Sequence, residues 1–350
     1  YGAASLSHPV EWKNAHVARV MEMVRANVNN PSIVIWSLGN EAGPGKNFVA
    51  AYDALKKFEE ATGKKFDSLD TSRPVQYERN NDIVDMGSNQ YPSIGWVRGA
   101  VQGKYDIKYP FHISEYAHSM GNACGNLIDY WEAMESTNFF CGGAIWDWVD
   151  QSMYNYDPKT GVRYLAYTPN DGQFVMNGIV FGDLEPKPQY YEVKKVYQHI
   201  GVKAIDTEKG VFEIFNKYYF KNLAEDYQLV YSLYEDGKPI MTGKPMDINI
   251  APRQRAQITL PYDHASLKKD AEYFMKLQFI LKDQRPWAAK GFPMAEEQIL
   301  IKEATDRPSI SEVTAGAAKQ DGFVLDKDTK RILIKGADFE AIFDPQTGSI

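Results

Sequence analysis

Residues 33–41 read Ile-Val-Ile-Trp-Ser-Leu-Gly-Asn-Glu, an apolar run that ends in an amide and a carboxylate. The apolar part is continuous rather than alternating, which is typical of a strand buried on both faces in a parallel sheet. The spacing of apolar residues predicts an amphipathic helix before this strand, over 12–28, and another after it, over 48–61. This alternation of helix and strand predicts an α/β fold.

Further strands of the same kind follow, and polar residues stand at their ends. We predict them at 75–77, 83–86, 111–114 and 143–146, with a helix over 126–136. In a parallel (β/α)8 TIM barrel the carboxyl ends of the strands meet on one face, where the active site is built. About five such strands are present and a barrel has eight, so about three are expected before Tyr1. We therefore predict that 1–199 is the C-terminal part, the later half, of a TIM-barrel catalytic domain.

The pattern changes near residue 200 to short alternating segments separated by turns. These segments lie at 202–205, 211–215, 228–234, 247–250, 256–260, 273–281 and 298–301. About seven short strands of this kind are typical of an immunoglobulin-like β-sandwich, which we predict over 200–307. Strand-like runs at 323–325, 331–334 and 339–343 predict the beginning of a further, C-terminal β domain over 308–350. The chain is thus predicted to be multidomain.

Composition excludes several classes of function. The 350 residues carry a net charge of −7 and contain no basic run, which disfavours binding to nucleic acid or to an anionic membrane. No apolar stretch approaches the roughly 20 residues of a membrane-spanning helix. The two cysteines, Cys124 and Cys141, stand in no CxxC motif and are expected to be ordinary thiols. The sequence leaves the compartment and the oligomeric state open, and the full-length protein could be a homo-oligomer.

Glu41 and Glu115 are the leading pair of candidate catalytic residues. Each follows an apolar strand, so each is expected at the rim of the barrel. Glycoside hydrolysis needs two carboxyl groups beside one bond, about 5–5.5 Å apart in retaining enzymes and about 6.5–9.5 Å apart in inverting ones. Neighbouring strand ends can supply such a separation. Taken alone, a glutamate at a strand end is also compatible with a salt bridge or a helix start.

Ordered motifs around these two glutamates carry a family resemblance. They are the stretches 36–41 (WSLGNE), 113–122 (ISEYAHSMGN), 146–151 (WDWVDQ), 168–174 (TPNDGQF) and 176–178 (MNG). Together they resemble glycoside hydrolase family 2, and within it the large multidomain bacterial β-galactosidases. The resemblance implies a retaining exo-β-galactosidase that hydrolyses terminal β-D-galactose, as in lactose, through a galactosyl-enzyme intermediate.

The resemblance also implies roles for single residues. Glu41 would be the general acid/base, and Glu115 the nucleophile that forms the covalent intermediate. Tyr91 would donate a hydrogen bond to that nucleophile and take part in proton transfer. Read without the family, Tyr91 is only an aromatic residue at a strand end beside Pro92.

Three residues would contact the sugar. Asn40 would bind the 2-hydroxyl, His118 would contact galactose hydroxyls, and Trp146 would offer an apolar face. The plainer alternatives stay open: Trp146 and Trp148 could fill the core of a barrel, and His118 could be an ordinary loop histidine.

Metal ions are implied in the same way. Glu41 would be a ligand of Mg²⁺, and the carbonyl of Phe174 with Asn177 would help to hold Na⁺. The remaining ligands are expected outside this chain, so the isolated piece is expected to be inactive, since a misplacement of about 1 Å can cost about 10²-fold in rate. The family's glycine-rich run before Thr168 is missing here, either as a shortened loop or as absent residues.

Two rival functions remain. A sibling activity, β-glucuronidase or β-mannosidase, would use the same carboxylates. A glucuronidase needs cations for the sugar carboxylate, whereas residues 146–148 and Phe174 suggest an aromatic and acidic wall. A non-catalytic carbohydrate-binding module would need neither Glu41 nor Glu115. Linkage preference and natural substrate are left open.

Overall fold

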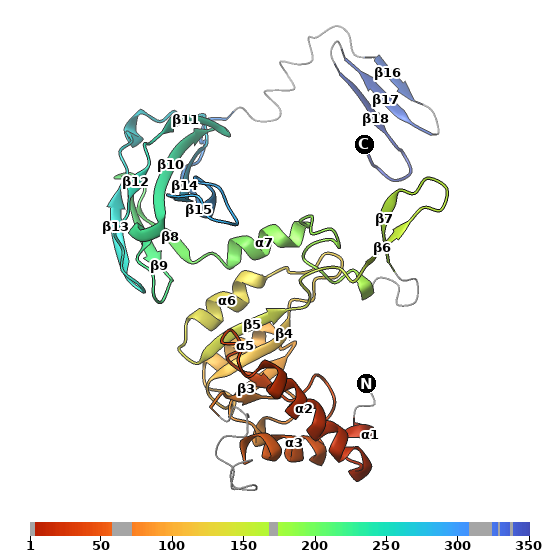
Figure 1. Cartoon of the computed structure of the whole chain (residues 1–350). Helices are drawn as coiled ribbons and strands as arrows, with labels where there is room; N and C mark the ends of the chain where they lie inside the picture. The colour runs from red at the N-terminus through yellow and green to blue at the C-terminus, as the bar shows by residue number, and fades with distance from the viewer. Residues whose placement is uncertain (1–3, 58–71, 168–173, 308–323, 328–329, 337–338) are drawn as a thin grey trace. The chain divides into compact units, whose positions relative to one another are not determined.

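The structure, a computed structural model, describes residues 4–57, 72–167, 174–307, 324–327, 330–336 and 339–350. The chain divides into two compact units, Tyr1–Tyr197 and Gln198–Ile350 (Figure 1). The first unit combines helices with short parallel strands, and the second is built mainly from antiparallel strands.

The first unit contains the elements from α1 to α7. Its helices are α1 (Ala4–Ser7), α2 (Lys13–Asn27), α3 (Lys46–Lys56), α5 (Ile94–Val101), α6 (Leu127–Glu135) and α7 (Pro188–Val196), with the 3-10 turns η1 (Val10–Trp12) and η2 (Asn81–Ile83). Its strands are β1 (Trp36–Ser37), β2 (Val75–Gln76), β3 (Gly87–Gln90), β4 (Phe111–Tyr116), β5 (Phe140–Ile145), β6 (Met153–Tyr156) and β7 (Arg163–Ala166). The antiparallel hairpin of β6 and β7 was not expected from the sequence.

Parallel pairing dominates this unit, as the sequence predicts. β1 pairs with β2, and β3, β4 and β5 form a three-stranded sheet in that order. The helices α2 and α3 share a core with β1 and β2, in which Val24, Phe48 and Trp36 are almost fully buried. The carboxyl ends of parallel strands lie at one edge of their sheet, so the polar residues that follow the strands are brought to that edge.

Two expectations about these strands are wrong. The run at 83–86 is not a strand, and β3 begins instead at Gly87. A Cβ atom at Gly87 would lie 2.6 Å from the ring of Phe111 and 2.7 Å from the carbonyl of Lys108, so only glycine allows this close approach to β4. The run at 33–38 is not buried throughout, because β1 pairs with β2 only over Trp36–Ser37 and Val34 remains 65% exposed.

The second unit contains the elements from β8 onward. Its strands are β8 (Ile200–Asp206), β9 (Val211–Asn216), β10 (Tyr227–Glu235), β11 (Lys238–Thr242), β12 (Met246–Asp247), β13 (Arg255–Thr259), β14 (Tyr273–Leu281) and β15 (Pro293–Lys302). Two short helical turns, α8 (Leu223–Asp226) and η4 (His264–Ser266), connect them. The strands β16 (Val324–Lys327), β17 (Ile332–Lys335) and β18 (Glu340–Phe343) form a separate antiparallel sheet.

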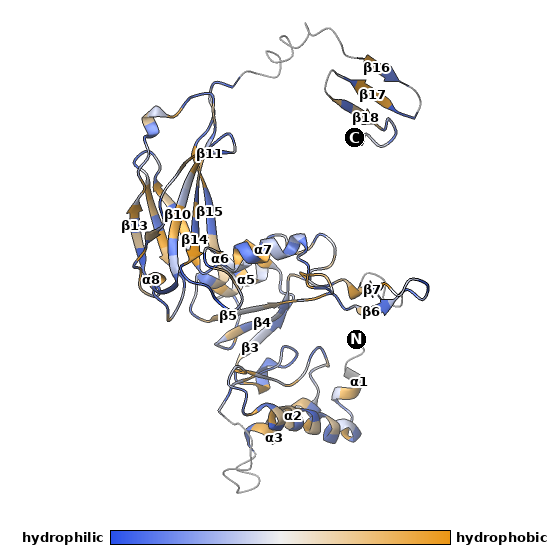
Figure 2. Ribbon diagram, turned by 45° about the horizontal axis from the view of Figure 1, so that its top comes forward, coloured by the Kyte–Doolittle hydropathy of each residue, from blue (hydrophilic) through white to orange (hydrophobic). Residues whose placement is uncertain are grey.

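Two antiparallel sheets of this unit enclose one core. One sheet has the order β13-β9-β8, and the other has the order β11-β10-β14-β15 with β12 also paired to β10. The core joins Phe212 and Ile214 of the first sheet to Leu229, Leu277 and Phe279 of the second, and all five are fully buried. Apolar residues, drawn orange in Figure 2, recur along β10 and β14 because alternate side chains of these strands face this core.

The strand expected at 247–250 is shorter than predicted, since β12 ends at Asp247. The carbonyl of Ile250 accepts hydrogen bonds from the backbone of Leu223 (3.1 Å) and from the side chain of Asn216 (2.9 Å). These partners occupy the carbonyl that would otherwise pair within a sheet. The side chains of Ile248 and Ile250 are nevertheless buried, as an apolar run predicts.

Candidate active site

Glu41 lies in the loop that follows β1, in an unusual backbone conformation. Its φ angle is +51°, in the left-handed region that residues other than glycine seldom adopt. Its backbone N–H donates a 2.7 Å hydrogen bond to the Glu78 carboxylate, which follows β2. Its own carboxylate is 17% exposed and lies 3.6 Å from the guanidinium of Arg79. The loop therefore presents a partly accessible carboxylate next to a fixed cation.

Tyr77 holds the other side of this loop. Its hydroxyl donates to the carbonyl of Gly43 (2.8 Å) and accepts from the backbone N–H of Ala42 (3.2 Å). Burial raises the pKa of Tyr77 well above its ordinary value of 10.0, so the hydroxyl keeps its proton and remains a donor. Tyr77, directly after β2, thus binds the backbone of Ala42 and Gly43, the two residues after Glu41.

Glu115 lies in β4, near its carboxyl end, and its neighbours in β3 are fixed by strand register. Gln90 is its register partner, and the backbone N–H of Tyr91 donates to the Glu115 carbonyl (2.8 Å). Tyr91 has a φ angle of +49° and is 41% exposed. The parallel pairing of β3 and β4 thus places the backbone of Tyr91 directly beside that of Glu115.

Arg79 and Gln90 connect the ends of the two parallel sheets. The Arg79 guanidinium donates to the Gln90 side-chain oxygen (2.9 Å), and the Gln90 amide donates to the Asn40 side-chain oxygen at 3.4 Å. Arg79 therefore reaches both Glu41 and the register partner of Glu115. This chain of contacts links the loop that presents Glu41 to the strand end that pairs with Glu115.

Aromatic side chains surround this edge. The ring centroids of Tyr91 and His118 are 6.1 Å apart, and those of His118 and Phe174 are 5.9 Å apart. The backbone of Ser119, next to His118, donates to the carbonyl of Trp146 (2.7 Å), and Trp146 is only half-buried. His118, Phe174 and Trp146 therefore lie in one neighbourhood with Tyr91.

Asn177 is fully buried beside Phe174. Its side-chain amide donates to the carbonyl of Phe174, while its side-chain oxygen is buried and has no hydrogen-bond partner. An unpartnered buried amide oxygen is a ligand type that hard cations prefer. Asn177 therefore fits a sodium site, although the Phe174 carbonyl already accepts a hydrogen bond here. The expected neighbours at 168–173 lie outside the described residues.

The magnesium prediction rests on fewer atoms. Among the residues that the structure describes, no group of three or more His, Cys, Asp or Glu side chains could hold a metal ion. Glu41 therefore remains the one magnesium ligand that the sequence predicts within this chain.

The segment around Asn177 is fixed by a buried ion pair. Residues 175–180 run beside 147–151, with hydrogen bonds that include Asp147 N–H to the Asn177 carbonyl (2.8 Å). The Asp150 carboxylate accepts hydrogen bonds from Lys187, from the Gly178 N–H (2.9 Å) and from the Tyr167 hydroxyl (3.1 Å). These contacts give Asp150 a structural role.

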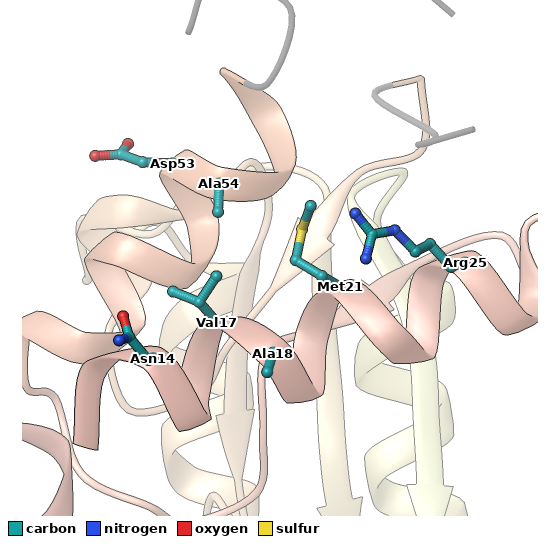
Figure 3. Close-up of a pocket in the computed structure, with 7 residues that line it drawn as sticks. All are labelled: Asn14, Val17, Ala18, Met21, Arg25, Asp53 and Ala54. Atoms are coloured by element: carbon teal, nitrogen blue, oxygen red, sulfur yellow. The ribbon is translucent and has the colours of Figure 1, made fainter. Parts of the chain in front are cut away.

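Two hollows among the described residues of the first unit lie elsewhere. One lies between α2 and α3, where Val17 and Met21 form its floor and Arg25 and Asp53 stand at its margins (Figure 3). Another, of about 640 Å³, is lined by residues 121–125 and by parts of 176–192. Neither is lined by Glu41 or Glu115, so neither defines the candidate active site.

Sequence reasoning missed Glu78 and Arg79, and it did not select Gln90. Glu41 and Glu115 were selected because each follows an apolar strand. The same criterion applies to Glu78 and Arg79, which follow β2. A polar run after a buried strand was therefore present in the sequence without being used.

Parallel strands followed by a glutamate at two of their carboxyl ends are compatible with a site of the glycosidase class. The family model described as "Glycosyl hydrolases family 2, TIM barrel domain" matches residues 3–202, and the chain belongs to this family. The model described as "Beta-galactosidase, domain 4" matches residues 212–302. The family resemblance indicated by the motifs is therefore confirmed: a TIM-barrel domain of family 2 is followed by a β-rich domain.

Relatives with known names are similar to nearly the whole chain. A "Beta-galactosidase" of Priestia megaterium is 33% identical over 353 residues, which cover 97% of this chain and 32% of the relative. A "Beta-galactosidase" of Psychromonas ingrahamii is 32% identical over 372 residues, which cover 99% of this chain and 34% of the relative. The chain thus spans about a third of the length of the curated relatives that it matches.

Likeness to solved structures is weaker. The crystal structure of Bacteroides uniformis beta-glucuronidase has a TM-score of 0.35 and 14% identity, and covers 97% of this chain and 42% of that chain. Likeness of this size carries no inference about the sugar. Within the described ranges, every helix is too short or too polar to span a bilayer.

Proposed function

We propose that this chain carries the catalytic carboxylates of a retaining exo-β-galactosidase, with a terminal β-D-galactoside such as lactose as substrate. The observation that carries the proposal is the contact chain from Glu41 through Arg79 and Gln90 to the register partner Glu115. This chain of contacts supports a site in which both glutamates flank one glycosidic bond, as glycoside hydrolysis requires. The choice of galactose is supported by relatives named beta-galactosidase at 32–33% identity.

The reaction would take place in two displacements. A Glu115 oxygen attacks the anomeric carbon while Glu41 passes its proton to the glycosidic oxygen, so the aglycone leaves as a neutral alcohol. The galactosyl group is then bound to Glu115 as an ester. Glu41, now a carboxylate, takes a proton from water, and this water attacks the same carbon to release galactose and restore Glu115.

Neighbouring residues would orient the sugar and the nucleophile. Tyr91 would donate a hydrogen bond from its phenol to the Glu115 carboxylate; its backbone N–H already donates to the Glu115 carbonyl at 2.8 Å, which keeps the two residues adjacent. Asn40 would bind the 2-hydroxyl, and Gln90 would orient the Asn40 side chain through their 3.4 Å contact. His118 would contact sugar hydroxyls, and the half-buried Trp146 would provide an apolar face.

The implied metals belong to the proposal as well. Asn177 and the Phe174 carbonyl would hold Na⁺, and Glu41 would be the ligand of Mg²⁺ from this chain. Bound cations would supply positive charge that holds sugar hydroxyls and orders the acid/base carboxylate. In the same way, we propose that residues 1–199 are the later part of a TIM barrel, 200–307 an immunoglobulin-like sandwich and 308–350 the start of a further β domain.

A second candidate is β-glucuronidase, and Arg79 is the observation that favours it. A sugar carboxylate needs a cationic partner, and the Arg79 side chain is 43% exposed at the site. Its guanidinium is already paired with Glu41 and Gln90, which leaves β-galactosidase as the stronger candidate.

A covalent trap tests the proposal on the longest natural polypeptide that contains these residues. The protein is incubated with a 2-deoxy-2-fluoro-β-galactosyl donor that has a good leaving group, and the labelled peptide is located by mass spectrometry. We expect a label on Glu115 and none in Glu115→Gln, whereas the matched control Glu132→Gln, an exposed change on α6, keeps the label.

The same trap separates the rival functions. A label only from the fluoro-glucuronyl or fluoro-mannosyl donor would replace galactose by that sugar. With no label from any of the three donors, the retaining mechanism fails, and a carbohydrate-binding module becomes the better description.

A further inference from the structure

Glu78 is a deeply buried carboxylate beside Glu41. It lies two residues after β2, and its side chain is only 2% exposed. One oxygen, Oε1, accepts the backbone N–H of Glu41 at 2.7 Å. The other oxygen, Oε2, is buried and has no hydrogen-bond partner. Burial of a polar oxygen without a partner is unfavourable, so a stabilising role in folding does not by itself account for this side chain.

The hydrogen bond acts on the residue whose orientation matters most. Glu41 has a left-handed backbone, which a residue with a Cβ atom keeps only when its surroundings impose it. A hydrogen bond from an N–H to a carboxylate is shorter and stronger than one between neutral groups. Glu78 therefore restrains the backbone at Glu41, and the direction of the Glu41 side chain follows from that backbone.

Arg79 completes the arrangement from the neighbouring position. Its Nε lies 3.7 Å from Glu78 Oε1, and its Nη2 lies 3.6 Å from Glu41 Oε1. The Arg79 guanidinium thus faces both the Glu78 carboxylate, which restrains the loop, and the Glu41 carboxylate at the end of that loop. Glu78 acts on the Glu41 backbone while Arg79 faces its side chain.

We propose that Glu78 is a positioning residue for the general acid/base Glu41, acting as the acceptor of the Glu41 backbone N–H. The proposal rests on the proposed function, because it assigns Glu78 a part in the proton-transfer steps of glycoside hydrolysis. Glu78 itself touches neither the substrate nor the reacting atoms. Its loss displaces the Glu41 carboxyl, and a displacement of about 1 Å can cost about 10²-fold in rate.

Asp85 provides a matched control at the other end of the same strand. Its carboxylate accepts the backbone N–H of Val75 (2.9 Å), pairs with Lys56 (3.0 Å) and accepts the Tyr52 hydroxyl (2.7 Å). It is therefore also a part-buried carboxylate that binds a backbone N–H at β2, but it has no contact with Glu41. Asp85→Asn reports what the loss of such a carboxylate does to the fold alone.

The test compares leaving groups in the longest natural polypeptide that contains the chain. Phenyl β-galactoside needs protonation of its leaving oxygen, whereas 2,4-dinitrophenyl β-galactoside does not. For Glu78→Ala we expect kcat/KM to fall by about 10²-fold on the first substrate and by less than about 5-fold on the second. Glu78→Gln, which keeps an acceptor oxygen at the same reach, is expected to recover phenyl β-galactoside hydrolysis to within about 5-fold of the wild type.

Azide provides a second readout that a general loss of structure does not produce. With the acid/base misplaced, azide attacks the galactosyl ester without needing a base, so it should speed dinitrophenyl turnover in Glu78→Ala and yield β-galactosyl azide. Asp85→Asn should show neither the leaving-group dependence nor the azide effect. An equal fall on both substrates in Glu78→Ala, no fall at all, or a Glu78→Gln variant as impaired as Glu78→Ala overturns the proposal.

A structural readout keeps the proposal separate from the proposed function. Amide hydrogen exchange of the peptide that contains Glu41 should become faster in Glu78→Ala but remain slow in Glu78→Gln. An inactive wild-type protein would refute the proposed function, while unchanged exchange in Glu78→Ala would refute the restraint of Glu41 by Glu78.

Discussion

The ion pair between Asp150 and Lys187 allows the most direct test of how the site is held. Both side chains are nearly inaccessible, with 1% of Asp150 and 9% of Lys187 exposed. Asp150 also accepts the Gly178 N–H and the Tyr167 hydroxyl. The pair thus fixes the segment that contains Asn177 against the segment that follows Trp146. The perturbation is Lys187→Met, which keeps the length of the side chain and removes its charge.

The expected loss of unfolding free energy depends on which partners the remaining charge keeps. Removal of one member of a buried pair costs about 3–5 kcal/mol, because the other charge is left buried without compensation. In Lys187→Met, Asp150 keeps its two neutral donors, so we expect the lower end, about 3 kcal/mol. In Asp150→Asn, Lys187 loses its carboxylate partner and keeps only neutral ones: the new side-chain amide oxygen, the Met176 carbonyl at 3.4 Å and the ring of Phe181 at 5.2 Å. A loss of similar size is therefore expected.

The double variant separates the pair from its surroundings. Asp150→Asn with Lys187→Met leaves no buried charge, so it should cost less than the sum of the single variants. Coupling between contacting residues is typically about 0.5–3 kcal/mol, and a buried ion pair belongs near the upper end. We therefore expect the double variant to lose about 3–4 kcal/mol rather than about 6.

Urea unfolding monitored by tryptophan fluorescence measures these values. Trp287 is the single tryptophan after residue 197 in the sequence, and it is 64% exposed, so a Trp287→Phe background makes the signal report the first unit. The free energy of unfolding is obtained from the midpoint and the slope of the transition. Single variants that each lose less than about 1 kcal/mol, or a double variant that loses the full sum, would refute the reasoning.

Three further predictions concern other parts of the chain. Gly178→Ala should lower the free energy of unfolding by at least about 1–3 kcal/mol in the same urea assay, because a Cβ atom there would lie 2.2 Å from a backbone nitrogen. Gly95→Ala in α5 is the control: the nearest atom to its Cβ would be 3.8 Å away, so the free energy of unfolding should rise by about 0.5–1 kcal/mol. Phe279→Ala should lower the stability of the second unit by about 3–5 kcal/mol, measured from its calorimetric transition, since the side chain is fully buried; a loss below about 1 kcal/mol would contradict the shared core. The hydrogen bond from Lys221 lowers the pKa of Asp226 below its ordinary value of 3.8, so the stability that it contributes is present above that value and is lost as the pH falls through the lowered pKa. Asp226→Asn should flatten this part of the acid unfolding curve, and an unchanged curve would contradict it.

The sequence was sufficient to locate the two catalytic candidates, and the reason is local. Glu41 and Glu115 each follow an apolar run, and the structure places Glu41 in the loop after β1 and Glu115 near the end of β4. The apolar runs marked where these strands lie, although β1 covers only Trp36–Ser37 of its run and Val34 is exposed. The run at 83–86 misled the prediction, since apolar side chains are also buried in a turn when their backbone is bonded elsewhere. Val84 and Met86 are buried there without a strand.

The amino-acid sequence by itself determined the alternation of helix and strand, the change to β structure near residue 200 and the family. These features depend on the order of apolar and polar side chains, which short stretches of the sequence specify directly. Only the tertiary structure decided that Arg79 connects Glu41 with Gln90, that Glu78 binds the Glu41 backbone and that Asp150 pairs with Lys187. Each of these contacts joins residues from separate strands or loops. Their distances depend on strand register and on the backbone angle at single residues, which no local pattern of polarity specifies.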